Sequence, residues 1–564
     1  MRVINTRTQQ YNDLPRGEKY AILSHTWETD EVTFQDLHTP ATARQKTGFQ
    51  KIEGFCKKAL QDGYSYGWAD TCCINNESSA ELGEAINSMY KWYQDADVCY
   101  ALLTDVDTTS TSVCPLEEQL AKSRWFTRGW TLQELLAPKT VIFFDNNWNI
   151  LGTKATMTEV LARLTRIDGA VLSGDAPLSQ RSIAQRMSWA ARRTTTRVED
   201  IAYCLLGIFD VNMPMIYGEG EKAFIRLQLQ ILEQSDDHSI FAWPIDGTGK
   251  QGMLADSPAA FRGTAGIGSL YSRRGRPSYR MTNRGLSLEL PAVPFAVDTY
   301  LAQLDCCNAL NGPSSRAGLA LGIFLRRLDE DDQYARVEYN GMTFRTISQY
   351  IDRPRIKFNI RQREDRAMLR NQKDSFNGFC VDGDFLPPSP QKLGYPPNMF
   401  IWEKHTRRMI AEAREGFGDV GYLAVNLGQI RVIKLGFDAQ FNPVCFLAAK
   451  AGLSNQVVGY LNPKQNLFML TEGLQPTEEG NIQKYGILER HASDMVGWSK
   501  VLNDRAHALE YHQGLWAVKG DRLHGIDVVL ENPRSTLSQK LFHLQITREY
   551  LDNGKEWRVS LELL

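Results

Sequence analysis

The sequence predicts an α/β domain built on a parallel sheet over residues 1–155, a helical segment over 156–240, and a β-rich region over 241–564. Three changes along the chain predict this division. Short apolar runs alternate with helical patterns up to about residue 150, helical periodicity then takes over, and short alternating runs separated by Gly, Pro, Asn and Asp follow. With 564 residues the chain is also too long for a single hydrophobic core.

Strands and helices are expected to alternate in the first part. Strands are predicted at 20–27, 65–74, 97–106 and 140–145, and helices at 47–63, 81–96 and 131–137. This alternation is typical of a parallel sheet with helices on both faces, in which ligands bind at the carboxyl ends of the strands. The polar tails of the strands at 20–27 and 65–74 lie at those ends, so we expect a site there.

The later parts differ in their periodicity. Apolar residues at helical spacing predict helices at 157–167, 181–193 and 222–234. Thr196 and Glu199 have the T-x-x-E spacing of a capping box, which predicts a further helix start. Beyond residue 241 the alternating runs favour a β-sandwich or a pair of small β domains, interrupted by one helix at 403–417.

Composition excludes several classes of protein. The net charge of −2 and the pI of about 6.5 give no electrostatic footprint for nucleic acid. The N-terminus lacks an apolar signal core, and no apolar run approaches the ~20 residues of a membrane span. The ten cysteines include no pair with zinc spacing and are typical of a reducing compartment. We therefore expect a cytoplasmic protein without a nucleic-acid partner, membrane span or metal.

Two motifs invite a catalytic interpretation that their context does not favour. YGEGEKAF at 217–224 lacks the spacing of a phosphate-binding loop, so a glycine-rich helix entry is the better interpretation. Cys72 and Cys73 lie in a predicted apolar strand without a basic neighbour, which favours core thiols over a nucleophile.

Ser24, His25 and Asp70 contain the ingredients of a nucleophilic triad. However, Ser24 and His25 are adjacent on a predicted strand, so their side chains should point to opposite faces of the sheet. The chain also has no G-x-S-x-G elbow. A serine hydrolase is therefore disfavoured, and Asp70 stays open between a structural role and one in holding a ligand hydroxyl.

The stretch SRWFTRGWTLQELLAP at 123–138 contains a second candidate carboxylate. Glu134 follows Trp130 by four residues, so the two share one helical face. Glu134 is either a first-turn acid favoured by the helix dipole or a carboxylate that binds substrate. Arg124 and Arg128 either meet phosphates or pair with nearby acids.

Three blocks of the first part resemble the fungal heterokaryon-incompatibility (HET) family: 20–37, 67–106 and 123–138. The segment 192–228 also resembles the region that follows this domain in a subgroup of the family. The resemblance implies a role in non-self recognition, in which fusion of genetically different fungal cells triggers programmed cell death. No nucleotide-binding oligomerisation module or repeat is recognised, so the trigger is expected from the β-rich region or from a protein partner.

HET domains are in turn remotely similar to Toll/interleukin-1 receptor (TIR) domains, many of which cleave NAD. The TIR first strand F-L-S-F-R-G-E-D-T-R resembles residues 22–30, although His25 and Trp27 replace the usual Phe and Gly. The catalytic-helix pattern W-C-x-x-E-L resembles residues 130–135. This resemblance implies a flavodoxin-like or TIR-like sheet with Glu134 as the catalytic carboxylate. The implied substrate-binding residues are Ser24, His25, Trp27, Asp70 and Trp130.

The resemblances together imply a cell-death effector of fungal innate immunity. It would hydrolyse NAD, as a substrate and without a cofactor, to nicotinamide and ADP-ribose when it self-associates into a homo-oligomer. The alternative is a non-enzymatic adaptor whose HET domain assembles to recruit a death executioner. In a third interpretation the β-rich region is the sensor and binds a carbohydrate or peptide ligand.

Overall fold

The computed structural model describes residues 1–109, 115–245, 252–270 and 276–296, and shorter stretches between 299 and 362. Beyond residue 377 it describes the backbone of individual strands. The chain divides into two compact units. The first comprises residues 1–246, 253–281 and 304–321, and the second comprises 247–252, 282–303 and 322–564. No helix among the described residues is long and apolar enough to cross a bilayer.

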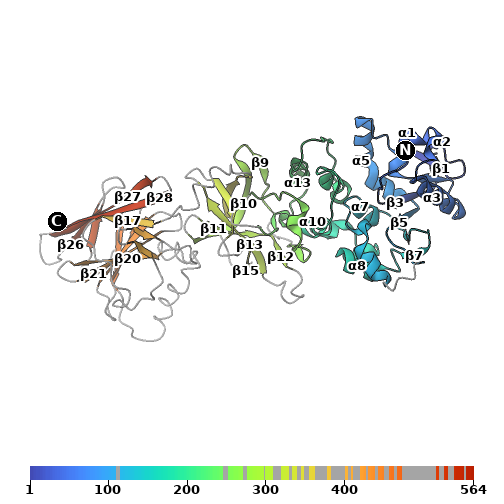
Figure 1. Ribbon diagram of the computed structural model, residues 1–564. Coiled ribbons are helices and arrows are strands. Elements are labelled where there is room, and N and C mark those ends of the chain that lie inside the picture. Colours follow the sequence, from blue (N-terminus) through green and yellow to red (C-terminus); the bar gives the residue numbers. More distant parts are fainter. Residues whose placement is uncertain are drawn as a thin grey trace. The chain divides into compact units, whose positions relative to one another are not determined.

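A seven-stranded sheet forms the centre of the first part of unit 1, in the order β2-β1-β4-β3-β5-β6-β7 (Figure 1). Its strands are β1 (Arg2–Asn5), β2 (Tyr11–Asp13), β3 (Tyr20–His25), β4 (Tyr66–Trp68), β5 (Val98–Leu102), β6 (Val141–Phe144) and β7 (Ile150–Thr153). The four central strands are parallel, as expected, while β1, β2 and β7 add antiparallel edges that the sequence did not predict. The mixed α/β class with a parallel core is therefore confirmed.

Helices cover both faces of this sheet. The predicted helices correspond to α3 (Phe49–Gln61), α5 (Ser79–Asp95) and α7 (Thr131–Leu136), and short helices α1 (Phe34–Leu37), α2 (Pro40–Ala43) and α6 (Leu116–Lys122) join them. On β5, Tyr100 packs edge-on against Phe55 of α3, whereas the neighbouring Cys99 faces the backbone of α7. Because neighbours on a strand point to opposite faces, α3 and α7 lie on opposite sides. Figure 1 shows α3 and α5 on different sides of β3.

The predicted strand at 65–74 is wrong in its second half. β4 ends at Trp68, and Asp70–Cys73 forms a one-turn helix, α4, closed by a hydrogen bond of 2.8 Å from Cys73 N to Ala69 O. An acid at the start of a helix is favoured by the backbone N–H groups there. Cys72 is fully buried, and its hydrogen bond to Cys73 together with burial raises the pKa of its thiol well above the usual value. A core thiol therefore remains the better interpretation.

The predicted helical segment is present in unit 1. It contains α8 (Thr158–Thr165), α9 (Gly169–Leu172), α10 (Ile183–Ala190), α11 (Asp200–Tyr203), α12 (Leu206–Phe209) and α13 (Lys222–Gln234), with 3-10 turns η2 (Leu178–Gln180) and η3 (His238–Phe241). A further 3-10 turn, η4 (Pro258–Phe261), lies within the region predicted to be β-rich. The expected capping box at 196–199 does not form, because α11 begins at Asp200 without a side-chain cap. A capping box does form at the start of α10, between Ser182 and Gln185.

The carboxylate of Glu199 instead organises the glycine-rich stretch at 217–224. Its Oε1 accepts hydrogen bonds from Gly218 N at 2.8 Å and Gly220 N at 3.0 Å. Both glycines have positive φ, +99° and +63°, which other residues adopt only with strain. Hydrogen bonds from backbone N–H groups, first that of Glu199 itself and then those of Gly220 and Gly218, lower the pKa of Glu199. The loop thus binds an internal carboxylate and leads into α13, in agreement with a helix entry.

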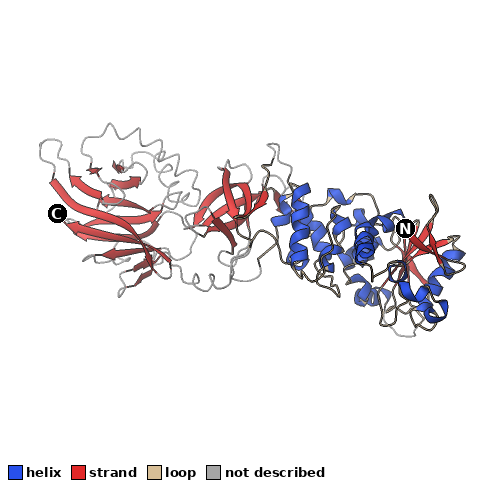
Figure 2. Cartoon of the chain, turned by 90° about the horizontal axis from the view of Figure 1, so that it is seen from above, coloured by secondary structure: helices blue, strands red, loops and turns tan. Residues whose placement is uncertain are grey.

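The described elements of the β-rich region are strands from β8 onward (Figure 2). In unit 1, β8 (Ile267–Ser269) pairs with β12 (Cys306–Asn308). The predicted helix at 403–417 is wrong where the structure describes it, at Glu403 and 408–410, and its other residues lie outside the described ones. The remaining strands are β9 (Arg280–Thr282), β10 (Gly285–Ala296), β11 (Thr299–Leu304), β13 (Leu319–Arg327), β14 (Gln333–Val337), β15 (Arg345–Ser348), β16 (Arg355–Ile360), β17 (Gly378–Asp382), β18 (Ile401–Glu403), β19 (Arg408–Ile410), β20 (Asp419–Asn426), β21 (Ile430–Phe437), β22 (Pro443–Ala449), β23 (Val457–Asn462), β24 (Leu467–Glu472), β25 (Trp516–Lys519), β26 (Ile526–Leu530), β27 (Gln539–Leu551) and β28 (Gly554–Leu563).

The packing of α12 on α5 yields a stability prediction. A methyl group at Gly207 would collide with Cβ of Tyr90 on α5, so Gly207→Ala should lower the free energy of unfolding by about 2 kcal/mol, as overpacking does. In the control Gly83→Ala, within α5, the nearest atom to the new methyl is Met215 Cγ at 4.0 Å. This variant should gain ~0.5–1 kcal/mol from helix propensity. Urea denaturation of both variants measures the difference, and equal stabilities would contradict the packing.

Candidate functional site

Glu134 lies on α7 and points at the carboxyl end of β3. Its Oε2 accepts a hydrogen bond of 2.5 Å from the Ser24 hydroxyl, and the Trp125 indole Nε1 donates to Ser24 Oγ at 2.8 Å. All three side chains are enclosed, with Glu134 3% exposed and the other two fully buried. A chain of hydrogen bonds therefore runs from the indole through the hydroxyl to the carboxylate.

Enclosure changes the acidity of Glu134. Burial raises its pKa to about 8, and the negative charge of Asp70 acts in the same direction. The Ser24 hydrogen bond and the positive charges of Arg128 and Arg193 oppose this shift. Glu134 is thus protonated in most molecules near neutral pH and becomes an anion as the pH rises through about 8.

His25, Asp70 and Trp27 form a second cluster at the same end of the sheet. His25 Nε2 lies 3.2 Å from Asp70 Oδ1, and the Trp27 indole donates to Asp70 Oδ2 at 2.8 Å. Lys51 Nζ lies 3.2 Å from His25 Nδ1 and also pairs with Glu31. Because an ammonium group only donates, Nδ1 accepts, and the imidazole proton is on Nε2, facing Asp70.

The environment of Asp70 shifts its pKa opposite to that of Glu134. Burial would raise the pKa of Asp70, but the hydrogen bonds from His25 and Trp27 lower it below its usual range. Asp70 is therefore the anionic carboxylate of the pair at neutral pH. Two acids with opposite protonation states at one site resemble the arrangement by which enzymes divide acid and base roles.

Ser24, His25 and Asp70 do not form a nucleophilic triad. Ser24 faces α7 and donates to Glu134, whereas His25 contacts Lys51 of α3 on the opposite face of the sheet. The structure thus confirms the predicted opposite orientation of the two neighbours on β3. Of the six site residues predicted from sequence, it brings Ser24 to Glu134 and joins His25 and Trp27 to Asp70.

Trp130, the sixth, precedes Glu134 by one turn, and its side chain contacts another helix. It occupies the N-cap position of α7, and its indole hydrogen-bonds to Asp200 at the start of α11. Its contact with Glu134 is a backbone one, with Glu134 N 3.5 Å from Trp130 O. Its side chain therefore ties α7 to the helical segment.

Two buried cations hold α7 at its ends. Arg193 Nη1 donates to Arg128 O at 2.7 Å, just before the first turn of α7, and to Thr131 Oγ1 at 2.9 Å, within that turn. Lys154 Nζ donates to Leu135 O at 3.3 Å and to Pro138 O at the other end. Burial lowers the pKa of Arg193 to about 10 and that of Lys154 to about 8. Cations suit carbonyl groups at a helix C-terminus, so Lys154 stabilises the C-terminal end of α7, while Glu134 projects from its first turn.

The two arginines of the 123–138 stretch have distinct surroundings. Arg124 pairs with acids, at 2.6 Å from Glu28 Oε1 and 3.5 Å from Asp105 Oδ2. Arg128 offers its carbonyl to Arg193, and the charge of its side chain lowers the pKa of Glu134.

The structure adds contributors that sequence analysis missed, chiefly Trp125, Lys51 and Arg193. Trp125 and Arg193 lie within stretches that resemble the HET family, which is the only sequence signal for them.

The site offers an enclosed, titratable carboxylate, an anionic partner, and the Trp27 ring, which is 41% exposed and available for stacking. Among the described residues no cluster of His, Cys, Asp or Glu is placed to hold a metal ion.

Comparison with known proteins agrees with the first resemblance. Residues 20–118 match the sequence model of the family described as heterokaryon incompatibility protein (HET). Over 227 residues the chain is 47% identical to the vegetative incompatibility protein HET-E-1 of Podospora anserina, a match that covers 39% of this chain and 17% of that protein. No solved structure matches the chain significantly. The resemblance to the HET family is thereby confirmed for residues 20–118, and the match spans only a small part of the relative's length.

Enclosure of Glu134 predicts a pH-dependent cost in stability. Between the usual glutamate pKa of 4.5 and about 8, the folded state binds a proton that the unfolded chain has lost. Stability of the wild type therefore falls as the pH rises through this window. The side chain in Glu134→Gln stays neutral. The free energy of unfolding of this variant, relative to that of the wild type, should therefore increase by up to about 1.4 kcal/mol per pH unit and stop increasing above about pH 8.

Urea denaturation of both proteins across this pH range measures the effect. Glu117→Gln is the matched control, because the Glu117 side chain is 53% exposed and should show no such trend. A difference between Glu134→Gln and the wild type that does not change with pH would contradict the assigned burial.

Proposed function

We propose that this chain is an effector of vegetative incompatibility that cleaves NAD to nicotinamide and ADP-ribose with Glu134 as its catalytic carboxylate. The observation that carries the proposal is the titratable Glu134 carboxylate at the carboxyl end of β3, held by Ser24 and Trp125. The HET match and the name of the Podospora relative support the biological role. The TIR-like fold is part of the same proposal, supported by the parallel strand order around β3 and β5.

The main requirement of the reaction is a negative charge that stabilises the positive charge developing on the ribose. The glycosidic C–N bond breaks, its electron pair leaves with nicotinamide, and the ribose becomes an oxocarbenium-like cation. Water then adds to C1′ and releases a proton, which gives ADP-ribose. An anionic Glu134 near the ribose hydroxyls stabilises the developing positive charge, as carboxylates do in glycoside hydrolysis. Protonated Glu134 supplies no such stabilisation.

The second cluster would bind the rest of the substrate. Trp27 offers an exposed ring face for a cationic or purine ring, and its indole N–H is fixed by Asp70. His25 is buried with both ring nitrogens engaged, so it positions the Asp70 carboxylate, whose oxygens accept hydrogen bonds and suit a ribose hydroxyl. NAD is a substrate in this proposal, and no cofactor is required.

The site is closed as it stands. Glu134 is 3% exposed and Ser24 fully buried, so NAD reaches the carboxylate only when the structure around it opens. We propose that self-association drives this opening, which would keep the resting protein inactive in a cytoplasm that contains NAD. Cytoplasmic placement and the homo-oligomer belong to this proposal.

The same closure favours one alternative. A carboxylate that stays enclosed acts only as a structural partner for Ser24, and the HET domain is then a non-enzymatic adaptor that assembles to recruit an executioner. A β-rich sensor region or a separate protein would supply the trigger in either case. The two functions differ in whether nicotinamide appears.

Glu134→Gln should abolish NAD cleavage. Purified full-length protein at high concentration should release nicotinamide, and the variant should do so at least ~100-fold more slowly, because it keeps the hydrogen bond from Ser24 but lacks the charge. Glu117→Gln, which removes an exposed carboxylate, should match the wild type. Chromatographic measurement of nicotinamide decides: release by Glu134→Gln at the wild-type rate would overturn the enzymatic role and favour the adaptor.

The rate should rise with pH. The reactive form is the Glu134 anion, and burial in the closed protein raises its pKa to about 8. At protein concentrations where the closed form predominates, kcat/KM for NAD should therefore increase as the pH rises through about 8. Ser24→Ala removes a hydrogen bond that lowers this pKa, so its profile should shift to higher pH. Initial rates over a pH series test both points, and a profile that falls over this range would contradict them.

A further inference from the structure

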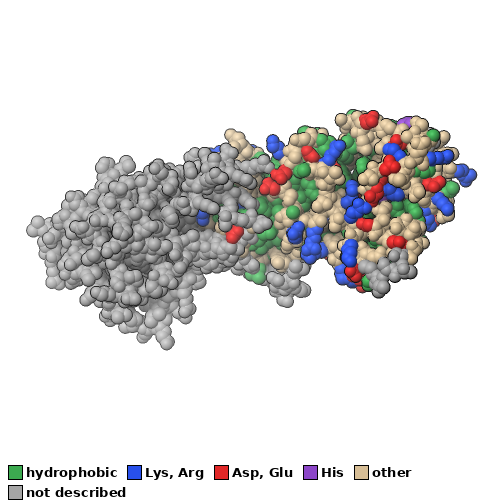
Figure 3. Space-filling model, in the orientation of Figure 1, with side chains coloured by type: hydrophobic (Ala, Val, Ile, Leu, Met, Phe, Trp, Pro, Cys, Tyr) green, Lys and Arg blue, Asp and Glu red, His purple; other side chains and the backbone are tan. Residues whose placement is uncertain are grey.

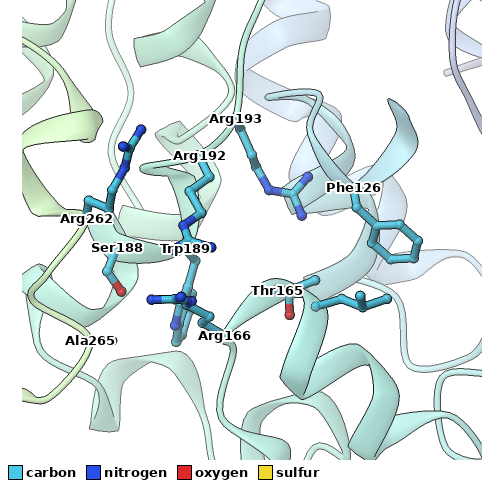
Figure 4. Close-up of a pocket in the computed structure, with 10 residues that line it drawn as sticks. Phe126, Thr165, Arg166, Ser188, Trp189, Arg192, Arg193, Arg262 and Ala265 are labelled. Atoms are coloured by element: carbon cyan, nitrogen blue, oxygen red, sulfur yellow. The ribbon is translucent and has the colours of Figure 1, made fainter. Parts of the chain in front are cut away.

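A hollow in unit 1, separate from the Glu134 cluster, is lined by basic side chains (Figure 4). It lies between the end of α8, the end of α10, and the turn after η4. In the space-filling view, Lys and Arg side chains gather over the region between α10 and α8 (Figure 3). The lining residues are Phe126, Leu164, Thr165, Arg166, Ser188, Trp189, Arg192, Arg193, Arg262 and Ala265. Four of the ten are arginines and none is an acid.

Three of these arginines have no counter-ion in the part of the chain that the structure describes. Arg166, Arg192 and Arg262 are exposed and form no ion pair with a described residue. Nearby arginines outside the hollow behave differently, since Arg163 pairs with Glu117 at 2.9 Å and Arg181 with Asp168 at 2.6 Å. These positive charges repel one another because no acid lies among the residues that line the hollow. An anion bound in the hollow would reduce this repulsion.

The backbone at Arg166 adds an independent observation. Arg166 is the C-cap of α8 and adopts the left-handed conformation, with φ +60°. Helices commonly end in this conformation with glycine or asparagine, because other residues adopt it only at an energetic cost. Arg166 therefore combines a charged side chain with a strained backbone conformation. Strained backbone conformations are found preferentially at functional sites such as ligand-binding sites.

The fourth arginine limits what the hollow binds. The guanidinium of Arg193 is buried and already donates to Arg128 O and Thr131 Oγ1, so it contributes mainly charge. Trp189 is only 4% exposed and offers no ring face for a nucleobase. Recognition therefore falls to three guanidinium groups from three separate segments, each able to bind two oxygens of a phosphate in a fork.

We propose that this hollow binds a diphosphate group, either free pyrophosphate or the diphosphate of a nucleotide. Two linked phosphates carry more oxygens and more negative charge than one, and so match the three guanidinium groups of Arg166, Arg192 and Arg262 better than a single phosphate does. The site is distinct from the Glu134 cluster and does not depend on NAD cleavage. It touches α7 through Arg193, so a bound anion lies one side chain away from the helix that carries Glu134.

Calorimetric titration of the full-length protein tests the proposal. Sodium pyrophosphate, orthophosphate, sulfate and ADP-ribose are compared at equal ionic strength with the wild-type protein. Pyrophosphate should bind with one site per chain and at least about tenfold more tightly than orthophosphate or sulfate. Arg166→Asn and Arg262→Gln should each weaken it about tenfold or more, the size of one charge-assisted hydrogen bond. Asparagine tolerates the left-handed conformation, so the first variant should fold.

Arg163→Gln is the matched control, since it removes one positive charge from α8 outside the hollow. Equal weakening in this control would mean diffuse electrostatic attraction and overturn the site. Absence of pyrophosphate binding, or equal affinity for orthophosphate, would also overturn it. Binding of ADP-ribose with the same dependence on Arg166 and Arg262 supports a nucleotide source, and binding of pyrophosphate alone supports a free one. Because no step measures NAD cleavage, failure here leaves the proposed function separately testable.

Discussion

The hydrogen-bond chain from Trp125 through Ser24 to Glu134 is the interaction on which the N-terminal domain depends. It connects the end of β3 to the 3-10 turn η1 (Arg124–Phe126) and to α7, two neighbouring elements that lie about 100 residues further along the chain. The buried hydroxyl satisfies an indole N–H and a carboxylate at once, so loss of Ser24 leaves two polar groups without their partner. Arg193 and Lys154 extend this constraint by fixing the two ends of α7.

The alternation of side chains along β3 separates two acidic environments. Ser24 presents Glu134 to a dry interior, while the next residue, His25, supports Asp70 on the other face. One carboxyl group consequently has a raised pKa and the other a lowered one, although their charges still interact. A single strand end thus holds a protonated acid and an anion near one another, which neither residue would achieve on an exposed surface.

Much of this architecture could be predicted from local pattern, and the errors have physical causes. Helices α5 and α7 and strands β3, β5 and β6 follow from periodicity, because the period depends only on neighbouring residues. The strand predicted over Asp70 was wrong, because an apolar run of this length fits a strand or a helical turn equally well. Glu134 was identified by family resemblance and not by residue spacing. The role of Trp125 was not predicted because its partner Ser24 is 101 residues away in the sequence.

The glycine loop closed by Glu199 has a consequence for how α13 responds to its surroundings. A tethered carboxylate has an effective concentration of ~1 mM or more at the backbone N–H groups of Gly218 and Gly220. A dissolved phosphate competes with it only by exceeding that concentration or by bringing further contacts. The start of α13 is therefore insensitive to ordinary fluctuations in metabolite levels, since its anion is covalently part of the chain.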